Sequence, residues 1–190
     1  MVIDIVRQFN WVDILVLVLA ARICYIGIKQ GFPAELFKLP GTILAIYLSL
    51  HYYTMFSDIA RDNMNLRIIP LEFLDLISFV ILACLGYLFF IVLREVFARF
   101  LKMEAVPKLN KWGGCILSLA RAYLLAGLIA YALAISTVGY LKDSVHRSYS
   151  GNYLFKVSPT TYSWLWNNIM SKFMSHEKFN KTVNEVQEKF

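Results

Sequence analysis

The stretch 122–141, AYLLAGLIAYALAISTVGYL, contains twenty residues without a formal charge. A helix of about twenty apolar residues crosses the roughly 30 Å hydrocarbon core of a bilayer. Two other runs, residues 39–57 and 76–93, are also free of formal charge. Backbone amides in lipid must be hydrogen-bonded within their own segment, so runs of this length become helices. The pattern therefore predicts an integral membrane protein with the lipid bilayer as its solvent.

The composition of the 190-residue chain supports this prediction. Apolar residues other than glycine make up 58% of the chain and charged residues 17%, and the mean hydropathy is +0.56. Soluble domains average roughly 45–50% apolar with glycine included, and about 25% charged. A soluble domain of this length could not bury so much apolar surface. The composition excludes a soluble enzyme, a disordered chain and a secreted disulfide scaffold.

The chain has a formal net charge of +6, from 19 Lys and Arg against 13 Asp and Glu. These basic residues flank the apolar runs and form no stripe, which favours membrane-flanking charge over nucleic-acid binding. Cys24, Cys84 and Cys115 all lie inside apolar runs, with spacing that fits neither a disulfide framework nor zinc. They are predicted to be buried free thiols.

Four membrane spans are predicted, at roughly 11–28, 36–56, 72–93 and 114–138. No basic region precedes the first span, so it is expected to be retained and not cleaved as a signal peptide. Short connections make neighbouring spans antiparallel. The predicted fold is an all-α integral membrane protein: an antiparallel four-helix transmembrane bundle, with a C-terminal amphipathic helical tail. The bundle covers residues 1–140 and the tail residues 141–190.

The Lys and Arg bias of short connections predicts the orientation. The third connection holds five basic residues: Arg94, Arg99, Lys102, Lys108 and Lys111. The opposite side has Arg7, Arg61 and Arg67, and the near tail adds Lys142, Arg147 and Lys156. The totals for the two sides are nearly equal, but the third connection alone is strongly basic. It is expected in the cytoplasm, which places both termini on the outer side.

The tail differs in kind from the spans. Ser158 and Pro159 predict a helix start, with Ser158 as the N-cap. A stripe at helical spacing follows: Tyr162, Leu165, Trp166, Ile169 and Phe173. This helix is too polar to span and either lies in the membrane interface or docks against the bundle. A weaker stripe, in a short amphipathic helix or a frayed end, contains Phe179, Val183, Val186 and Phe190.

Ionisable residues inside a span are costly and are candidate functional or structural residues. Asp13 lies near the outer end of the first span, where it can reach interfacial water. Arg22 lies deeper, and nine residues of helix place it on the opposite face from Asp13. Three roles are open for Arg22: pairing with Glu35, snorkelling to the inner interface, or transport. Pairing with Glu35 is the favoured interpretation.

The fourth span carries small residues at every fourth position, and such rows let helix backbones approach closely in lipid. The helix-packing candidates are Gly114, Ser118, Ala122 and Ala126. Arg121 is three residues after Ser118 and shares this face. If the helix begins near Trp112, Arg121 lies deep in the membrane. If the span is instead 122–141, Arg121 is a boundary cation.

Motifs for catalysis or cofactor binding are not found. The sequence contains no HExxH, GxSxG, Walker or GxGxxG pattern. The histidines show no metal-ligand spacing and are interpreted as polar interfacial residues: His51, His146 and His176. We therefore expect no catalytic residue, cofactor or metal, and no enzymatic activity.

Three parts of the chain resemble the CvpA family, the colicin V production proteins of bacterial inner membranes. The first part is Asn10-Trp11-Val12-Asp13 with Gly27, Gly31-Phe32 and Glu35-Leu36 around the first turn, where Gln30 replaces a frequent basic residue. The second part is Leu109-Asn110-Lys111 followed by Gly114, Ser118 and Arg121-Ala122, where Ser118 and Ala122 replace family glycines. The third part is Ser148 with Tyr153-Leu154, Pro159 and Tyr162. The resemblance covers about residues 10–165.

The resemblance implies a multi-pass inner-membrane protein linked to colicin V production, a toxin biosynthetic process, and to envelope homeostasis. Similar domains fused to outward-facing proteases agree with periplasmic termini. The leading hypothesis is a non-enzymatic protein that supports export or envelope function through protein partners. A separate hypothesis is a purely structural assembly module with the outer tail as its docking surface. The alternative is a small homo-oligomeric channel or transporter, lined by Arg121, Arg22 and the small face of the fourth span.

Overall fold

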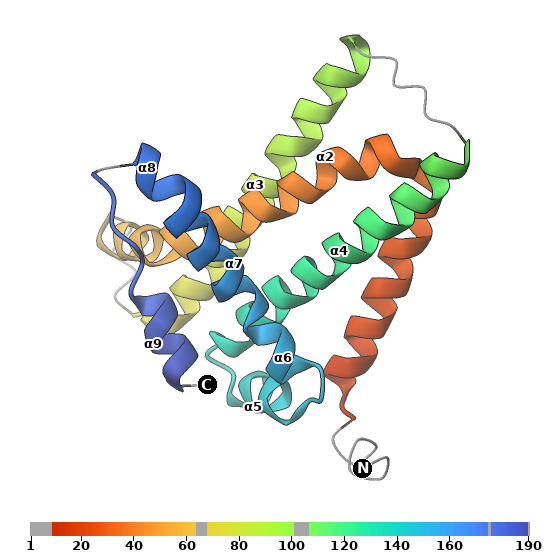
Figure 1. Cartoon of the computed structure of the whole chain (residues 1–190). Helices are drawn as coiled ribbons and strands as arrows, with labels where there is room; N and C mark the ends of the chain where they lie inside the picture. Colours follow the sequence, from red (N-terminus) through yellow and green to blue (C-terminus); the bar gives the residue numbers. More distant parts are fainter. Residues whose placement is uncertain (1–8, 64–67, 101–106, 175, 190) are drawn as a thin grey trace.

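The computed structural model describes residues 9–63, 68–100, 107–174 and 176–189. These residues form helices joined by turns (Figure 1), and none of them forms a strand. Within them, three helices are long and apolar enough to cross a membrane. They are α2 (Trp11–Asn63), α3 (Leu71–Phe100) and α4 (Pro107–Ala134). The all-helical prediction is confirmed, whereas a four-helix antiparallel bundle is not, because two expected spans lie within α2.

The expected connection between the first two spans is helical except at a bend in α2 at Gly31, where φ is 77°. This left-handed value suits glycine, which has no Cβ to clash with the backbone. The bend divides α2 into a first arm, residues 11–30, and a second arm, residues 32–63, which diverge from it (Figure 1). Because the helix resumes at once after Gly31, no loop separates the arms.

Each arm of α2 runs antiparallel to a different apolar helix. The second arm runs antiparallel to α3, because Ala45 lies against Gly86 and the later residue Ser57 lies against the earlier residue Asp75. A Cβ on Gly86 would lie 2.8 Å from the Ala45 Cα, and the Ser57 hydroxyl donates a hydrogen bond to Asp75. The first arm runs antiparallel to α4, with Gly27 against Ser118. Since α3 and α4 have few contacts with each other, α2 joins the membrane helices together.

The apolar helices differ in length from the expected spans. Four of the five cations assigned to the third connection lie within α3 or α4, and the fifth, Lys102, lies outside the described residues, as do Arg7 and Arg67. The fourth span was expected to reach residue 138, but α4 ends at Ala134. There the Val138 amide donates to the Ser136 hydroxyl (3.2 Å) in a turn that precedes the next helix.

The outward faces of the three apolar helices are rich in large exposed hydrophobic side chains. Examples on three different helices are Val18 (62% exposed), Phe89 (58%) and Ile116 (65%). A soluble protein rarely leaves such continuous apolar surface in water. Lipid chains cover it without cost, so this exposure agrees with the membrane environment predicted from the composition.

The tail folds into short helices against the membrane helices (Figure 1). They are α5 (Gly139–Arg147), α6 (Gly151–Phe155), α7 (Val157–Leu165), the π-helical turn η1 (Trp166–Met170), α8 (Ser171–Phe173) and α9 (Thr182–Lys189). An aromatic core joins tail and membrane helices: the Tyr131 ring stacks on Phe155 at 5.6 Å between centroids and lies tilted against Phe79 at 5.5 Å.

The helix start expected at Ser158 is wrong by a short distance. The N-cap of α7 is Lys156, and Ser158 lies inside the helix with a fully buried hydroxyl. The chain passes from α6 to α7 through one residue, so there is no extended segment in which Ser158 could act as a cap. Pro159 is tolerated because amides in the first turn of a helix have no intrahelical acceptor.

The aromatic stripe of α7 docks against the bundle, which was the second of the two expected positions. Tyr162, Leu165 and Trp166 are buried, whereas Phe173 is 82% exposed. The end of the chain forms α9, which buries Val183 completely. A short amphipathic helix is therefore found where a frayed end was the alternative; Phe190 of that stripe lies outside the described residues.

Candidate functional site

A cluster of buried charges lies where the second arm of α2 meets α4. Glu35 is fully buried and its carboxylate receives two cations. The Lys38 ammonium lies 2.9 Å from Glu35 Oε1, and the Arg121 guanidinium contacts Oε2 through Nε at 2.8 Å and donates from Nη2 to Oε1 at 3.2 Å. Lys38 also donates to Gln30. In this cluster two cations share one carboxylate.

Arg121 lies well inside α4 and is 4% exposed. The apolar segment of this helix begins at Asn110, about 16 Å from Arg121 along the axis. The interpretation of Arg121 as a boundary cation is therefore wrong. Its guanidinium also donates from Nη1 to the Tyr87 hydroxyl of α3 at 3.1 Å. Arg121 thus connects all three apolar helices.

The predicted pairing of Arg22 with Glu35 is wrong, because Glu35 pairs with Lys38 and Arg121 instead. Arg22 is exposed and has no ion pair within the described part of the chain. It lines a cavity of about 420 Å³ together with Lys38 and Arg121. The rest of the lining is Leu19, Ile23, Ile26, Gln30, Tyr87 and Leu125.

The small residues of α4 lie where this helix crosses the first arm of α2. A Cβ on Gly114 would lie 2.6 Å from the Gly27 carbonyl oxygen, and a Cβ on Gly27 would lie 2.3 Å from Ser118 Cβ. Such distances leave room only for hydrogen, so the two backbones are in direct contact. Ser118, Ala122 and Ala126 are buried along the same helix.

Two of the cysteines meet at this crossing. The Cys24 and Cys115 sulfurs lie 3.5 Å apart, and both residues are half-buried free thiols. Cys84 is a free thiol and is exposed on α3, so the expectation of burial is wrong for it. A lipid-facing position has the same apolar composition as a core position in a membrane helix, which is why the sequence did not distinguish them.

The bend at Gly31 is held by Asn110, a residue not selected as a site candidate. The Phe32 amide donates to Asn110 Oδ1 at 2.8 Å, which supplies an acceptor for an amide at the start of the second arm. A Cβ on Gly31 would lie 2.0 Å from the same oxygen. Gly31 and Asn110 belong to two different stretches that carry the family resemblance, and the fold brings them into contact.

Asp13 is buried and anchors the tail, although interfacial exposure was expected for it. It is 3% exposed, and its Oδ1 accepts hydrogen bonds from the Ser148 hydroxyl (3.0 Å), the Ser150 amide (2.8 Å) and the Ser150 hydroxyl. Its Oδ2 accepts from the Asn10 amide at 2.8 Å. The start of α2 is thereby fixed to the turn between α5 and α6.

His51 forms a second anchor and is not the interfacial residue that was expected. It is 8% exposed and stacks on Trp166, with ring centroids 5.1 Å apart. Its Nδ1 lies 2.8 Å from the Tyr162 hydroxyl and its Nε2 lies 2.7 Å from Glu177 Oε2. A neutral ring that accepts at Nδ1 and donates from Nε2 satisfies all three groups. Only the polar character of His51 could have indicated this contact from the sequence.

Two tail residues that contact His51, Glu177 and Tyr162, have shifted pKa values. The Tyr52 hydroxyl donates to Glu177 (2.8 Å), and this bond, with a second from His51, lowers the pKa of Glu177 against the opposing effect of its partial burial. Burial raises the pKa of Tyr162 to about 12, so its hydroxyl keeps its proton. That oxygen also accepts from the Asn180 amide at 3.0 Å.

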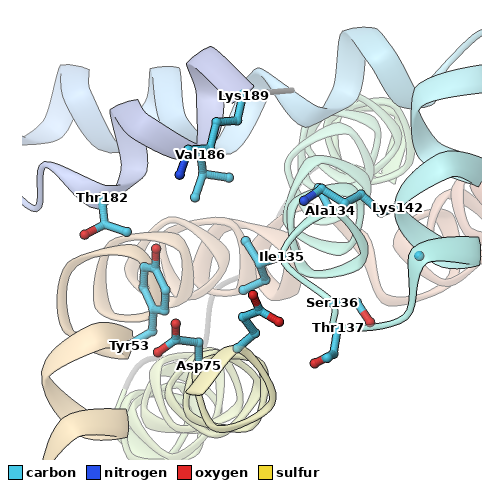
Figure 2. Close-up of a pocket in the computed structure, with 12 residues that line it drawn as sticks. Tyr53, Asp75, Ala134, Ile135, Ser136, Thr137, Lys142, Thr182, Val186 and Lys189 are labelled. Carbon is cyan, nitrogen blue, oxygen red and sulfur yellow. The ribbon is translucent and has the colours of Figure 1, made fainter. Parts of the chain in front are cut away.

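Another cavity of about 420 Å³ lies at the end of the bundle where the tail docks (Figure 2). Tyr53 from α2 and Asp75 from α3 lie on one side, and Lys142 from α5 and Lys189 from α9 lie across from them (Figure 2). Glu72 also lines it, so the fixed charges balance. Within the described ranges no group of three or more His, Cys, Asp or Glu is placed to hold a metal.

The apolar helices and the buried charges between them define a multi-pass membrane protein. A family model described as Colicin V production protein matches residues 12–159, which is most of the chain. The chain belongs to this family, as the resemblance of its three motifs predicted. No curated protein and no solved structure matches the chain.

Proposed function

We propose that this chain is a bacterial inner-membrane protein that supports colicin V production or export, or envelope homeostasis, by binding protein partners and without a chemical step. Family membership and the three apolar helices support a membrane role. The basic residues expected in the third connection lie mostly at the end of α3 and the start of α4, and this cluster supports a cytoplasmic position for that side and periplasmic termini. The tail then lies in the periplasm, where envelope partners are accessible.

The observation that supports this proposal is that the tail is anchored to the membrane helices and exposes aromatic side chains. Asp13 and His51 fix it to the membrane helices, so its outer surface is held in one position. The tail exposes several aromatic side chains: Tyr140 (67%), Tyr149 (46%), Tyr153 (70%), Trp164 (58%) and Phe173 (82%). Tyrosine and tryptophan are enriched at protein interfaces because they combine a large apolar area with a polar group.

Photocrosslinking in living cells tests the proposal. A photoreactive phenylalanine analogue at Tyr153 is expected to give discrete protein adducts. The same analogue at Val18, which is 62% exposed against 70% for Tyr153 but lies on a membrane helix, is the matched control and should give none of these adducts. Absence of discrete adducts from Tyr153 and from Trp164 would contradict partner binding through the tail. A C-terminal reporter active only outside the cytoplasm tests the orientation separately.

The second candidate function is a small oligomeric channel or transporter. It is favoured by the cavity at Arg22, Lys38 and Arg121, because intramembrane cations that line a cavity often mark a substrate path. Ion or solute flux into proteoliposomes that is lost in Arg121→Ala would support it. Three or four crossings are few for a monomeric pore, so a monomer mass in detergent would count against this candidate.

A further inference from the structure

The cavity at Arg22 has an unbalanced charge. Three cations line it, namely Arg22, Lys38 and Arg121. Glu35, behind the lining, is the only carboxylate paired with any of them among the described residues, and it already contacts both Lys38 and Arg121. The formal charge of this group is therefore positive by two. An uncompensated cation in a membrane helix is costly, so an anion in the cavity would be strongly favoured.

The shape of the cavity indicates what kind of anion fits. Along α2 its lining extends from Leu19 to Gln30, about 16 Å of helix. Gln30 is next to the bend at Gly31, and Lys38 donates to it, so polar groups gather at that end. Leu19, Ile23 and Leu125 give the cavity apolar walls. A free inorganic ion would leave these walls without a matching surface.

We propose that this cavity binds an anionic phospholipid, with the phosphate held by Arg22, Lys38 and Arg121 and an acyl chain along the apolar wall. Guanidinium and ammonium groups together are the usual recognition set for phosphate oxygens. Basic pockets between membrane helices are known to accept anionic headgroups. The Tyr87 hydroxyl and the Gln30 amide add neutral hydrogen-bonding groups to the lining. The inference does not depend on partner binding by the tail, which uses a different surface.

Native mass spectrometry of the full-length protein in an uncharged detergent tests this inference. Phosphatidylglycerol and phosphatidylcholine with identical acyl chains are the two probes. We expect phosphatidylglycerol to bind about tenfold more tightly, since only it lacks a cationic headgroup to oppose the cavity charge. Equal binding of the two lipids would overturn the proposal.

The Arg22→Gln variant distinguishes phosphatidylglycerol bound in the cavity from lipid bound anywhere on the outer surface of the membrane helices. We expect it to lower phosphatidylglycerol affinity about tenfold, since a charge-assisted phosphate contact is lost. The matched control is Arg147→Gln, which removes an exposed arginine on α5 away from the cavity and should leave affinity unchanged. Equal affinities in these two variants would also overturn the proposal. Arg22→Gln should fold, because Arg22 makes no ion pair in the described residues.

Two further measurements identify the ligand and the wall it contacts. Ile26→Trp, which fills the apolar wall without changing charge, should weaken phosphatidylglycerol binding, and unchanged binding would contradict a lipid in this cavity. If Arg22→Gln proves unstable, phosphatidylglycerol binding to Ile26→Trp tests the proposal in its place. Millimolar inorganic phosphate should not displace phosphatidylglycerol. Displacement would show a site for free phosphate and would overturn the lipid assignment.

Discussion

Glu35 is the residue through which the charges of the membrane helices are balanced. It is fully buried and holds Lys38 and Arg121. A buried ion pair adds little net stability compared with an apolar pair, but removal of one partner leaves an unpaired buried charge. The effect of a substitution here on the free energy of unfolding therefore depends on which charges of the cluster remain unpaired.

Glu35→Gln is expected to lower the free energy of unfolding in detergent by about 3–5 kcal/mol, because two cations lose their counter-ion. Glu35→Gln with Arg121→Gln should cost less than the sum of the single substitutions, since they belong to one network. Denaturant titration followed by tryptophan fluorescence measures all three. Glu95→Gln, at an exposed glutamate on α3, is the control and should change stability by less than about 0.5 kcal/mol. Additive effects of the two single substitutions would contradict the pairing.

Gly31→Ala is expected to destabilise the fold by more than about 1 kcal/mol, because the new Cβ meets both an unfavourable φ and the Asn110 side chain. Gly139→Ala is the control, since a Cβ there meets nothing within 4 Å. Thermal unfolding in detergent compares the two. Combining Gly31→Ala with Asn110→Ala relieves the contact but not the φ strain, so only partial recovery is expected. Equal stability of both glycine variants would contradict the bend.

At the scale of elements, the crossing of the first arm of α2 with α4 depends on backbone contact. Gly27 and Gly114 each leave no room for a Cβ. Lipid provides no hydrophobic drive between helices, so close packing of small residues supplies the attraction. The Cys24 and Cys115 thiols provide a direct measure of this crossing, because they lie 3.5 Å apart.

Copper phenanthroline with molecular oxygen is expected to join Cys24 to Cys115, with oxygen taking the two electrons and two protons that the thiols lose. Cys84→Ser provides the background, since it removes the exposed thiol. Gly114→Val should lower the disulfide yield several-fold, because the added atoms separate the helices and disulfide geometry is strict. Ile116→Val, at a side chain 65% exposed, is the control and should keep the yield. Alkylation mass spectrometry counts the remaining thiols, and an unchanged yield in Gly114→Val would contradict the packing.

At the scale of the whole molecule, two buried polar residues, Asp13 and His51, hold the tail to α2 at separate places. Asp13 holds the turn between α5 and α6, and His51 holds α7 and the segment at Glu177. The two anchors lie on different arms of α2. The tail therefore holds the two arms in a fixed position relative to each other. Its own position depends on how the arms are arranged.

Docking of the tail at His51 is expected to weaken in acid. The pKa of Glu177 is lower in the folded protein than its ordinary value of 4.5, so its contribution is complete above about pH 4.5 and is lost as the pH falls through the folded value. Limited proteolysis of the tail as a function of pH measures this change. Glu177→Gln should remove the acid-dependent component, and Glu188→Gln, at an exposed glutamate of α9, should retain it. The same profile in both variants would contradict the role of Glu177.

Much of the architecture could be predicted because lipid imposes simple requirements on sequence. Charge-free runs of about twenty residues must be helical, and the stripe of Tyr162, Leu165 and Trp166 has the period of a helix with one buried face. The bend at Gly31 was expected as a connection, since glycine and Pro33 both disfavour a helix interior. Tertiary contact from Asn110 instead lets the helix resume at once.

The partners within the candidate site could not be predicted in the same way. Helical spacing places Arg121 on the small-residue face, but the sequence indicated Arg22 and not Arg121 as the partner of Glu35. The observed pair is separated by 86 residues in the sequence, and the contact of His51 with Glu177 by 126. Spacing along one helix carries no information about which neighbour lies across from it.

The sequence by itself determined that this protein is helical, that it is a membrane protein and that it belongs to the Colicin V production protein family. Hydropathy, the helical period of apolar residues and the order of motifs can all be read along the chain without knowledge of tertiary contacts. Only the tertiary structure decided which cation pairs with Glu35, that Asp13 and His51 hold the tail, and that Arg22 faces a cavity. These depend on how helices far apart in the sequence pack. The close approach of Gly27 and Gly114, for example, brings the first arm of α2 against α4, although these residues lie 87 positions apart.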